Sequence, residues 1–203
     1  TMKRKLEYRW ALWCGVWMVI TLLAACDRWT KPTSSGRPYE VLVVVDDQLW
    51  QRPAGRALFD VLDTDVPGLP QPERSFRISQ TTQKRFSQVL NIFRTIIKVD
   101  IDPTQYTQTK MKFTRDVYAR PQVVLTIQSP NEKDFAAFVK KNSRSIIDFL
   151  VKVEMNRQIN ELEEKHSEAV SQLAEEIFKC QLWAPAEIKS YKKGKDFFWA
   201  SSN

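Results

Sequence analysis

The run Tyr39–Val45 is the feature that most restricts the fold of this chain. It is a continuous stretch of mostly β-branched residues with no regular alternation of apolar and polar side chains. Such a run predicts a strand buried on both faces. A helical pattern over about 48–62 follows directly. The folded domain is therefore expected to begin near Tyr39 as a strand followed by a helix.

Further strands and helices are predicted along the rest of the chain. A helix over 82–94 is expected to turn Phe86, Val89, Leu90 and Phe93 inward. The polar segment 106–115 is typical of an exposed or edge strand. Core strands are predicted over 76–79, 95–100 and 123–128, and more strand-like residues lie at 182–188 and 197–200.

The longest predicted element is a helix near residues 145–178, which contain neither Gly nor Pro. Its apolar positions advance by alternate steps of four and three and so form one stripe: Met155, Ile159, Leu162, His166, Ala169 and Leu173. An earlier helix through about Lys140 is predicted to start with Ser129 as its N-cap and Pro130 at its first position. The expected fold class is α+β, with a mixed or antiparallel sheet and helices packed on one face.

The N-terminus has the three parts of a bacterial lipoprotein signal peptide, in order. A basic start precedes mostly apolar residues over 10–23, and the small-residue run Leu23-Ala24-Ala25 ends in Cys26. Cleavage between Ala25 and Cys26 would follow attachment of diacylglycerol to the Cys26 thiol. N-acylation would then add a further chain, and stable membrane anchoring needs more than one. No other cofactor is predicted.

Three parts of the chain follow from this cleavage site. Residues 1–25 are the predicted signal, 26–38 are a polar tether rich in turn-forming residues, and 39–203 are the globular domain. Removing the signal takes away four basic residues and one acidic residue, so the net charge of +7 falls to +4. Only Cys180 then remains as a free thiol, so no intramolecular disulfide is expected. The modest positive charge fits anionic lipid or envelope polymers and does not favour nucleic acid.

Two pairs of carboxylates are the candidate ligand or metal-binding residues. Asp46 and Asp47 follow the buried strand, where α/β folds often bind ligands. The competing interpretation is that they cap the next helix. Asp100 and Asp102 flank Ile101 at a strand end, where they would hold a cation or share a proton. Here the alternative is a solvated turn before Pro103.

Other side chains admit both structural and functional interpretations. His166 is a packing residue or a pH-sensitive group on the helix stripe. Aromatic side chains would form the core or a platform for a glycan or peptide; these are Trp50, Trp183, Phe197, Phe198 and Trp199. The lysines between 189 and 195 are a solvated hairpin turn or a contact for anionic lipid or polysaccharide.

The predicted mature chain holds one His and none of the motifs CxxC, HExxH, GxSxG or a glycine-rich phosphate loop. We therefore expect a non-enzymatic envelope lipoprotein that binds a partner protein or an envelope polymer such as a polysaccharide. The alternative is a periplasmic hydrolase or metal-dependent enzyme that uses the four strand-end carboxylates.

Several runs are similar to the Bacteroidota lipoproteins grouped as domain of unknown function 4837. They are Gly36–Val41 leading into Val45-Asp46-Asp47, Asp63–Glu73, Val99–Pro103 and Lys195–Ala200. The resemblance covers nearly the whole mature chain and implies a lipid-anchored envelope protein with no assigned activity. It also implies that the natural protein continues beyond Asn203. The expected location is the periplasmic face of the outer membrane, with surface display as the alternative, because Asp27 stands alone in the tether.

The lipid anchor is tested by a Cys26→Ser variant. Because the thiol is the acceptor of diacylglycerol, this variant should lose acyl labelling and leave the membrane fraction of the cell. The measurement is metabolic labelling with a fatty-acid analogue, followed by fractionation. Retention of Cys26→Ser in the membrane fraction would contradict the lipoprotein interpretation.

Overall fold

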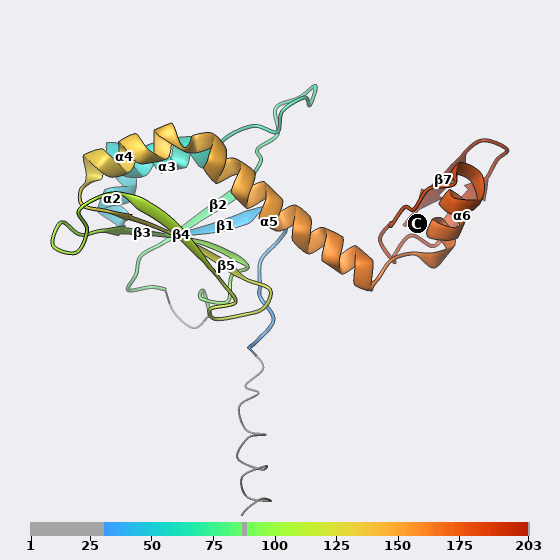
Figure 1. The fold of residues 1–203 in the computed structure, drawn as a ribbon, viewed down its shortest axis with the longest axis horizontal. Coiled ribbons are helices and arrows are strands. Elements are labelled where there is room, and N and C mark those ends of the chain that lie inside the picture. Colours follow the sequence, from blue (N-terminus) through green and yellow to red (C-terminus); the bar gives the residue numbers. More distant parts are fainter. Residues whose placement is uncertain (1–30, 87–88, 203) are drawn as a thin grey trace, which may run out of the picture. The chain divides into compact units, whose positions relative to one another are not determined.

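The computed structural model describes residues 31–86 and 89–202. Nearly all of them belong to one compact unit that begins at Thr33. The predicted signal and Cys26 lie outside the described residues. Within this unit Figure 1 shows a twisted sheet beside helices, as the α+β prediction requires.

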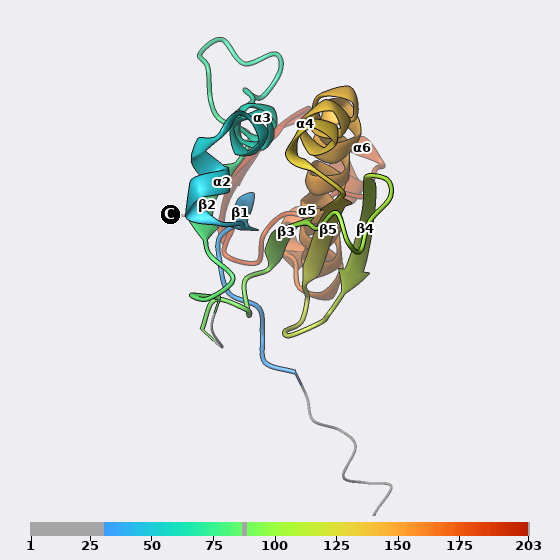
Figure 2. The same cartoon turned by 90° about the vertical axis from the view of Figure 1, so that its left-hand side faces the viewer.

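The main sheet has five strands in the order β2-β1-β3-β5-β4 (Figure 2). The strands β1, β2, β3 and β5 are parallel, and β4 runs antiparallel to β5 along the edge. The sheet is therefore mixed, and the polar segment predicted as an edge strand is indeed one. The bounds are β1 Glu40–Val44, β2 Arg77–Thr81, β3 Thr95–Ile101, β4 Lys110–Arg115 and β5 Val123–Ser129.

Helices α2 (Asp47–Gln51), α3 (Pro53–Leu62), α4 (Glu132–Lys141) and the first half of α5 (Ser143–Glu164) pack on one face of this sheet. Alternate residues of each strand supply the core beneath them, such as Val41, Val43 and Val45 of β1. The helix predicted over 48–62 is two helices, because Pro53 keeps the preceding Arg52 in an extended conformation. Gly55 lets α3 approach α2 closely, since a Cβ there would lie 2.3 Å from the carbonyl oxygen of Leu49.

The helix α4 begins two residues later than the capping pattern suggested. Asn131 is its N-cap, and the Asn131 side chain accepts a hydrogen bond from the Asp134 amide at 2.8 Å. Ser129 is instead the last residue of β5, is fully buried, and donates its hydroxyl to the carbonyl of Asn131 at 2.9 Å. Since the Ser129 hydroxyl bonds to the Asn131 carbonyl and Pro130 has no polar side chain, Asn131 is the first residue whose side-chain oxygen accepts a hydrogen bond from an amide of the helix.

Loops cover part of the opposite face of the sheet, and the prediction of a helix over 82–94 is wrong for the described residues of that segment, which form turns. The two ends of this segment still contribute Phe86 and Phe93, which pack against a small cluster of Val44, Ile96 and Val124. The carbonyls of Asn91 and Phe93 accept hydrogen bonds from the buried amide of Gln122, each at 2.7 Å. These bonds attach the end of the loop to Gln122, the residue before β5.

Residues 33–36, placed in the predicted tether, also pair with this loop. The amide of Ser35 donates to the carbonyl of Ile92, and the amide of Arg94 donates to the carbonyl of Ser35, both at 2.8 Å. Thr33 forms a further bridge with Arg120. This part of the polar N-terminal segment therefore lies against the domain.

The helix predicted near 145–178 is two helices, α5 and α6 (Glu168–Phe178). Between them the amide of Ser167 donates to the carbonyl of Ala184 at 2.9 Å, and its hydroxyl donates to the carbonyl of Ile188 at 2.8 Å. The segment 182–188 is irregular and does not form the predicted strand. Because the Ser167 amide donates to Ala184 in this segment, it is not available for the next hydrogen bond of α5, and the helix ends. None of the helices in residues 31–86 and 89–202 has the length and apolar content needed to cross a bilayer.

The buried face of α5 is not the predicted apolar stripe. Met155 and Ile159 are 49% and 47% exposed, whereas Ile146, Leu150, Glu154 and Arg157 are buried. The apolar positions do advance by alternate steps of four and three, but the charged residues Glu154 and Arg157 lie on the buried side of the helix. The stripe prediction is therefore wrong over the second half of α5.

Glu154 and Arg157 form a buried ionic cluster with the residues at the start of β3. One Glu154 oxygen lies 2.9 Å from Arg157 Nη1, and the other lies 2.9 Å from Arg94 Nη2, an ion pair without hydrogen-bond alignment. Arg157 also donates to Thr95 Oγ1 at 2.8 Å and to the Arg94 carbonyl. Burial lowers the pKa of the Arg157 guanidinium, and Glu154 opposes that shift. The cluster connects α5 to the amino end of β3.

The C-terminal residues form a separate two-stranded antiparallel sheet of β6 (Ser190–Lys193) and β7 (Phe198–Ser201). The predicted strand over 197–200 matches β7 closely. β6, however, uses residues assigned to the lysine-rich turn, so the turn itself is shorter than predicted.

Glu154→Ala should lower the free energy of unfolding by about 3–5 kcal/mol, because it leaves the buried guanidinium of Arg157 and the half-buried guanidinium of Arg94 without their carboxylate. Urea denaturation at neutral pH measures this loss. Glu163 lies on the exposed side of the same helix, and Glu163→Ala should change the free energy by less than about 0.5 kcal/mol. Equal effects of the two substitutions would contradict the role of the cluster.

Candidate functional site

Three of the four predicted carboxylates line one cleft at the carboxyl ends of β1 and β3. Asp46, Asp47 and Asp100 contribute to this carboxyl-edge cleft, which has a volume of about 1020 Å³. Asp102 follows β3 by one residue and is not among the residues that line it. The cleft lies where β1 and β3 are adjacent but their chain connections leave in opposite directions, the usual ligand position in open parallel sheets.

Asp46 and Asp47 are both engaged within the protein. The Asp46 carboxylate accepts from the Gln48 amide at 2.9 Å and is the N-cap of α2, as the capping interpretation predicted. The Asp47 carboxylate accepts from Arg85 Nη2 at 2.6 Å and from Gln80 Nε2 at 2.9 Å. Asp47 thereby connects α2 to β2 and to the loop after it.

The carboxylates of Asp100 and Asp102 bind different partners and do not form the predicted pair. The hydroxyl of Tyr106 donates to Asp100, and Gln128 Nε2 donates to the same hydroxyl at 2.6 Å. Asp102 instead accepts from the amide and hydroxyl of Thr104, at 2.8 and 2.6 Å, as in the predicted turn. These hydrogen bonds from Thr104 lower the pKa of the Asp102 carboxyl group. Among the described residues no group of three His, Cys, Asp or Glu side chains is placed to hold a metal ion.

Lys98 lines the carboxyl-edge cleft and is a residue that sequence reasoning missed. Its ammonium donates to the Tyr118 hydroxyl at 3.0 Å and lies 4.7 Å from the centre of the Phe86 ring. An ammonium over an aromatic face is held by the ring quadrupole. The side chain is therefore positioned by two residues from different parts of the chain, Phe86 and Tyr118, and is half-buried.

The strand pattern contained a signal for this site. On the face opposite the helices, β3 begins with apolar Ile96 and continues with Lys98 and Asp100. Their register partners on β5 are Thr126 and Gln128. The amino half of this face is thus apolar and covered, while the carboxyl half is polar. The sequence of β3 alone shows this change from apolar Ile96 to polar Lys98 and Asp100.

The loop after β2 forms the remaining wall of the cleft. It supplies Thr82, Gln83, Lys84 and Arg85, all of which line the cleft. Arg85 is paired with Asp47. The cleft therefore combines three basic and three acidic side chains. Among the described residues, no contact pairs Lys84 or Lys98 with any of these three carboxylates.

His166 and the aromatic residues do not contribute to this cleft. His166 Nδ1 contacts the Leu162 carbonyl oxygen at 2.9 Å, and its ring stacks on Trp183 with centroids 5.8 Å apart. Trp50 is the buried residue of α2 and belongs to the core between the helices and the sheet. Trp199 belongs to the C-terminal hairpin, so no single aromatic platform joins it to Trp50.

The hydrogen bond to Asp100 raises the pKa of the Tyr106 phenol, and burial adds to this. A raised folded-state pKa means that the contribution to stability is present below the ordinary tyrosine pKa of about 10 and is lost as the pH rises through the folded value. Phenolate absorbance should therefore show one tyrosine that ionises late. Asp100→Asn should shift this ionisation to lower pH, and Tyr106→Phe should remove it. A late ionisation that persists in Tyr106→Phe would contradict the assignment.

The family comparison corrects the predicted resemblance. The chain matches the model of a domain of unknown function, DUF8532, over residues 34–163, from the residues before β1 almost to the end of α5. This is a different family from domain of unknown function 4837, and nothing in the match indicates Bacteroidota lipoproteins. No curated protein and no solved structure matches the chain. Because the match covers the sheet, its helices and the cleft, the chain belongs to the DUF8532 family.

Proposed function

We propose that this protein is a lipid-anchored cell-envelope protein that binds an anionic group of an envelope polymer in the carboxyl-edge cleft. The anchor is Cys26, on the grounds of the signal-peptide pattern alone. The ligand chemistry is a carboxylate or phosphate on an extended polymer segment. The observation that carries this proposal is the placement of Lys98 in the cleft.

Lys98 has donors to offer a ligand. An ammonium group has three donors, and the described structure accounts for one of them, in the bond to Tyr118. The Phe86 and Tyr118 rings hold the ammonium without neutralising it, because neither ring carries a formal charge. Lys84, exposed on the neighbouring loop, supplies a second positive charge in the same cleft.

The size of the cleft favours a polymer segment over a single ion. Its volume of about 1020 Å³ is at the upper end of ordinary ligand sites. Thr82, Gln83 and Thr126 line it as well and offer neutral hydrogen-bonding groups. The three cleft carboxylates are engaged by Gln48, Arg85 and Tyr106. A sugar or peptide chain bearing one acidic group therefore fits a cleft in which Lys98 and Lys84 are the charges left for a ligand and the other polar side chains are neutral.

The carboxylates favour binding over hydrolysis. A general acid or base must be within reach of the substrate proton. Here Asp46 caps a helix, Asp47 pairs with Arg85, and Asp100 accepts from Tyr106. Each carboxylate thus has a structural partner, and the enzymatic alternative would require these contacts to break.

A photo-crosslinking amino acid in place of Gln83 tests the proposal in the full-length protein within its native envelope. Gln83 is an exposed residue of the cleft. We expect a covalent adduct with an envelope polymer, detected by mass spectrometry. Lys98→Met should reduce its yield about tenfold or more, because a hydrogen bond to a charged group contributes roughly 1.5–3 kcal/mol.

The matched control places the same crosslinker at Lys152, an exposed position on α5, which packs on the other face of the sheet, and Lys152 does not line the cleft. This position should give no polymer adduct. Equal adducts from both positions, or a yield unaffected by Lys98→Met, would overturn the proposal. Capture of a single protein at Gln83 would replace the polymer with a protein ligand.

A further inference from the structure

One face of the C-terminal hairpin is fixed against α6. Lys193 and Phe198 are register partners on β6 and β7, so their side chains share a face. Lys193 forms an ion pair with Glu176 of α6, and the Phe198 ring lies 6.0 Å from the ring of Phe178. This face is therefore the inner face of the hairpin.

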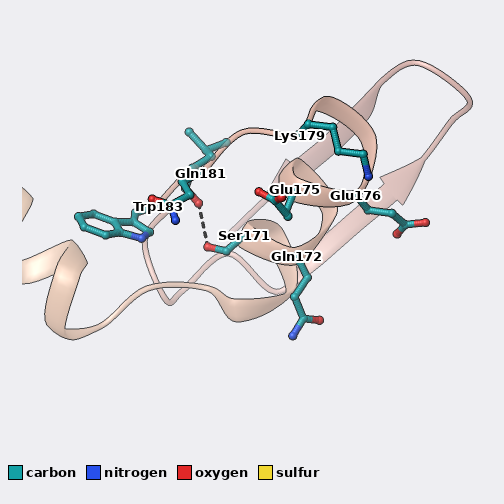
Figure 3. Close-up of a pocket in the computed structure, with 8 residues that line it drawn as sticks. Ser171, Gln172, Glu175, Glu176, Lys179, Gln181 and Trp183 are labelled. Carbon is teal, nitrogen blue, oxygen red and sulfur yellow. Dashed lines mark hydrogen bonds between the residues drawn. The ribbon is translucent and has the colours of Figure 1, made fainter.

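The α6 side of this segment carries both acidic and apolar side chains. A hollow of about 510 Å³ lies beside α6. Figure 3 shows Glu175 and Glu176 on the helix and Lys179 just after it. The hydroxyl of Ser171 donates to the carbonyl of Leu182 across it at 2.8 Å. The ion pair with Lys193 also lowers the pKa of the Glu176 carboxyl group. The carboxylate of Glu176 is thereby committed to holding the hairpin.

The outer face of the hairpin is basic and aromatic. Lys192 and Trp199 are register partners and lie on the face opposite Lys193 and Phe198. Trp199 is 55% exposed, and Phe197, at the turn, is 62% exposed. The Phe197 ring lies over Gly194, where a Cβ would come within 2.3 Å of it, so the turn accepts only glycine without rearrangement.

Positive charge surrounds these aromatic rings. The segment 189–196 contains four lysines and a single acidic residue, Asp196. Only Lys193 is paired with a carboxylate by a contact that the described residues show. We define the hairpin surface as Lys189, Lys192, Lys195, Phe197 and Trp199, all exposed.

We propose that this hairpin surface binds the surface of an anionic lipid bilayer. Trp and Phe rings enter the boundary between headgroups and acyl chains, while lysine ammonium groups stay at the level of the phosphates. Charge complementarity selects an anionic bilayer, because each lysine near such a surface gains electrostatic free energy. The contact adds a second attachment beyond the proposed anchor at Cys26, and needs only the envelope location in common with it.

The test uses the full-length protein with lipid vesicles. Hydrogen exchange of the amides over 189–201 is compared in vesicles of phosphatidylcholine alone and in vesicles that also contain phosphatidylglycerol. We expect slower exchange of the hairpin amides only in the anionic vesicles, and a return to fast exchange in high salt, which screens exposed charges. Amides of β5 should exchange equally in both, which verifies the fold.

Two variants separate the contributions. Replacing Lys189, Lys192 and Lys195 by Gln should weaken hairpin binding to anionic vesicles roughly 100-fold. The matched control replaces Lys110, Lys112 and Lys152, which are also exposed, and so has the same net charge. It should keep the protection of the hairpin. Trp199→Ser should lose the protection without changing the net charge.

Several outcomes would overturn the inference. Equal protection in neutral and anionic vesicles would remove the electrostatic basis. Protection that depends on protein concentration without vesicles would make the hairpin an interface between copies of the chain. Retention of Cys26→Ser in the membrane fraction, or failure of crosslinking at Gln83, would contradict the proposed function and would leave the exchange result on the hairpin unaffected.

Discussion

The parallel pair of β1 and β3 must be covered on both faces, and the rest of the domain depends on how that is done. Helices α2 to α5 cover β1 and β3 on one face. On the other face, Phe86, Phe93 and Tyr118 pack against Val44 of β1 and against Ile96 and Val124, which lie near the amino ends of β3 and β5. The carboxyl half of β3 carries Lys98 and Asp100 in place of apolar residues on this face. The candidate cleft thus lies over the polar carboxyl half of β3.

A second constraint acts at the opposite end of β3. Glu154 and Arg157 place a carboxylate and a guanidinium inside the interface of α5 with β3, where an apolar pair would be expected. Removing ions from water costs free energy that the pair regains only through good geometry. The bonds from Arg157 to Thr95 and to the Arg94 carbonyl provide it. They also fix the position of α5 along β3, because the donors match particular backbone and side-chain acceptors.

The family match divides the chain into a matched domain and a C-terminal segment. The family match ends at residue 163, so the sheet, the cleft and the ionic cluster belong to the matched domain, while α6 and the hairpin follow it. The match over 34–163 replaces the resemblance to domain of unknown function 4837, which had rested on short shared runs. The C-terminal segment makes its own contacts, such as those of Ser167, Ser171 and Lys193. This separation is consistent with two surfaces of different chemistry, one a cleft and one a basic aromatic hairpin.

The sequence by itself determined the elements whose pattern is local. The β-branched run at 39–45 specified β1, the polar segment near 106–115 specified an edge strand, and the carboxylates after β1 and β3 were recognised as neighbours of a possible site. Such features depend on periodicity and on strand ends, which are written in adjacent residues. The α+β class followed from them, whereas the choice between a mixed and an antiparallel sheet was left open and was decided by the structure.

Tertiary structure alone decided where long-range hydrogen bonds compete with local preference. The described residues of 82–94 form turns in place of the predicted helix, and the amide of Arg94 donates to Ser35 and not to a carbonyl one turn earlier in the segment. The long helix ends at residue 164 because Ser167 bonds to Ala184 and Ile188. The roles of Asp47 and Asp100 were likewise decided by Arg85 and Tyr106, partners that neither composition nor spacing identifies, whereas the N-cap role of Asp46 is local and was predicted from the sequence. Local sequence encodes propensity, whereas these contacts exist only once distant segments have been brought together.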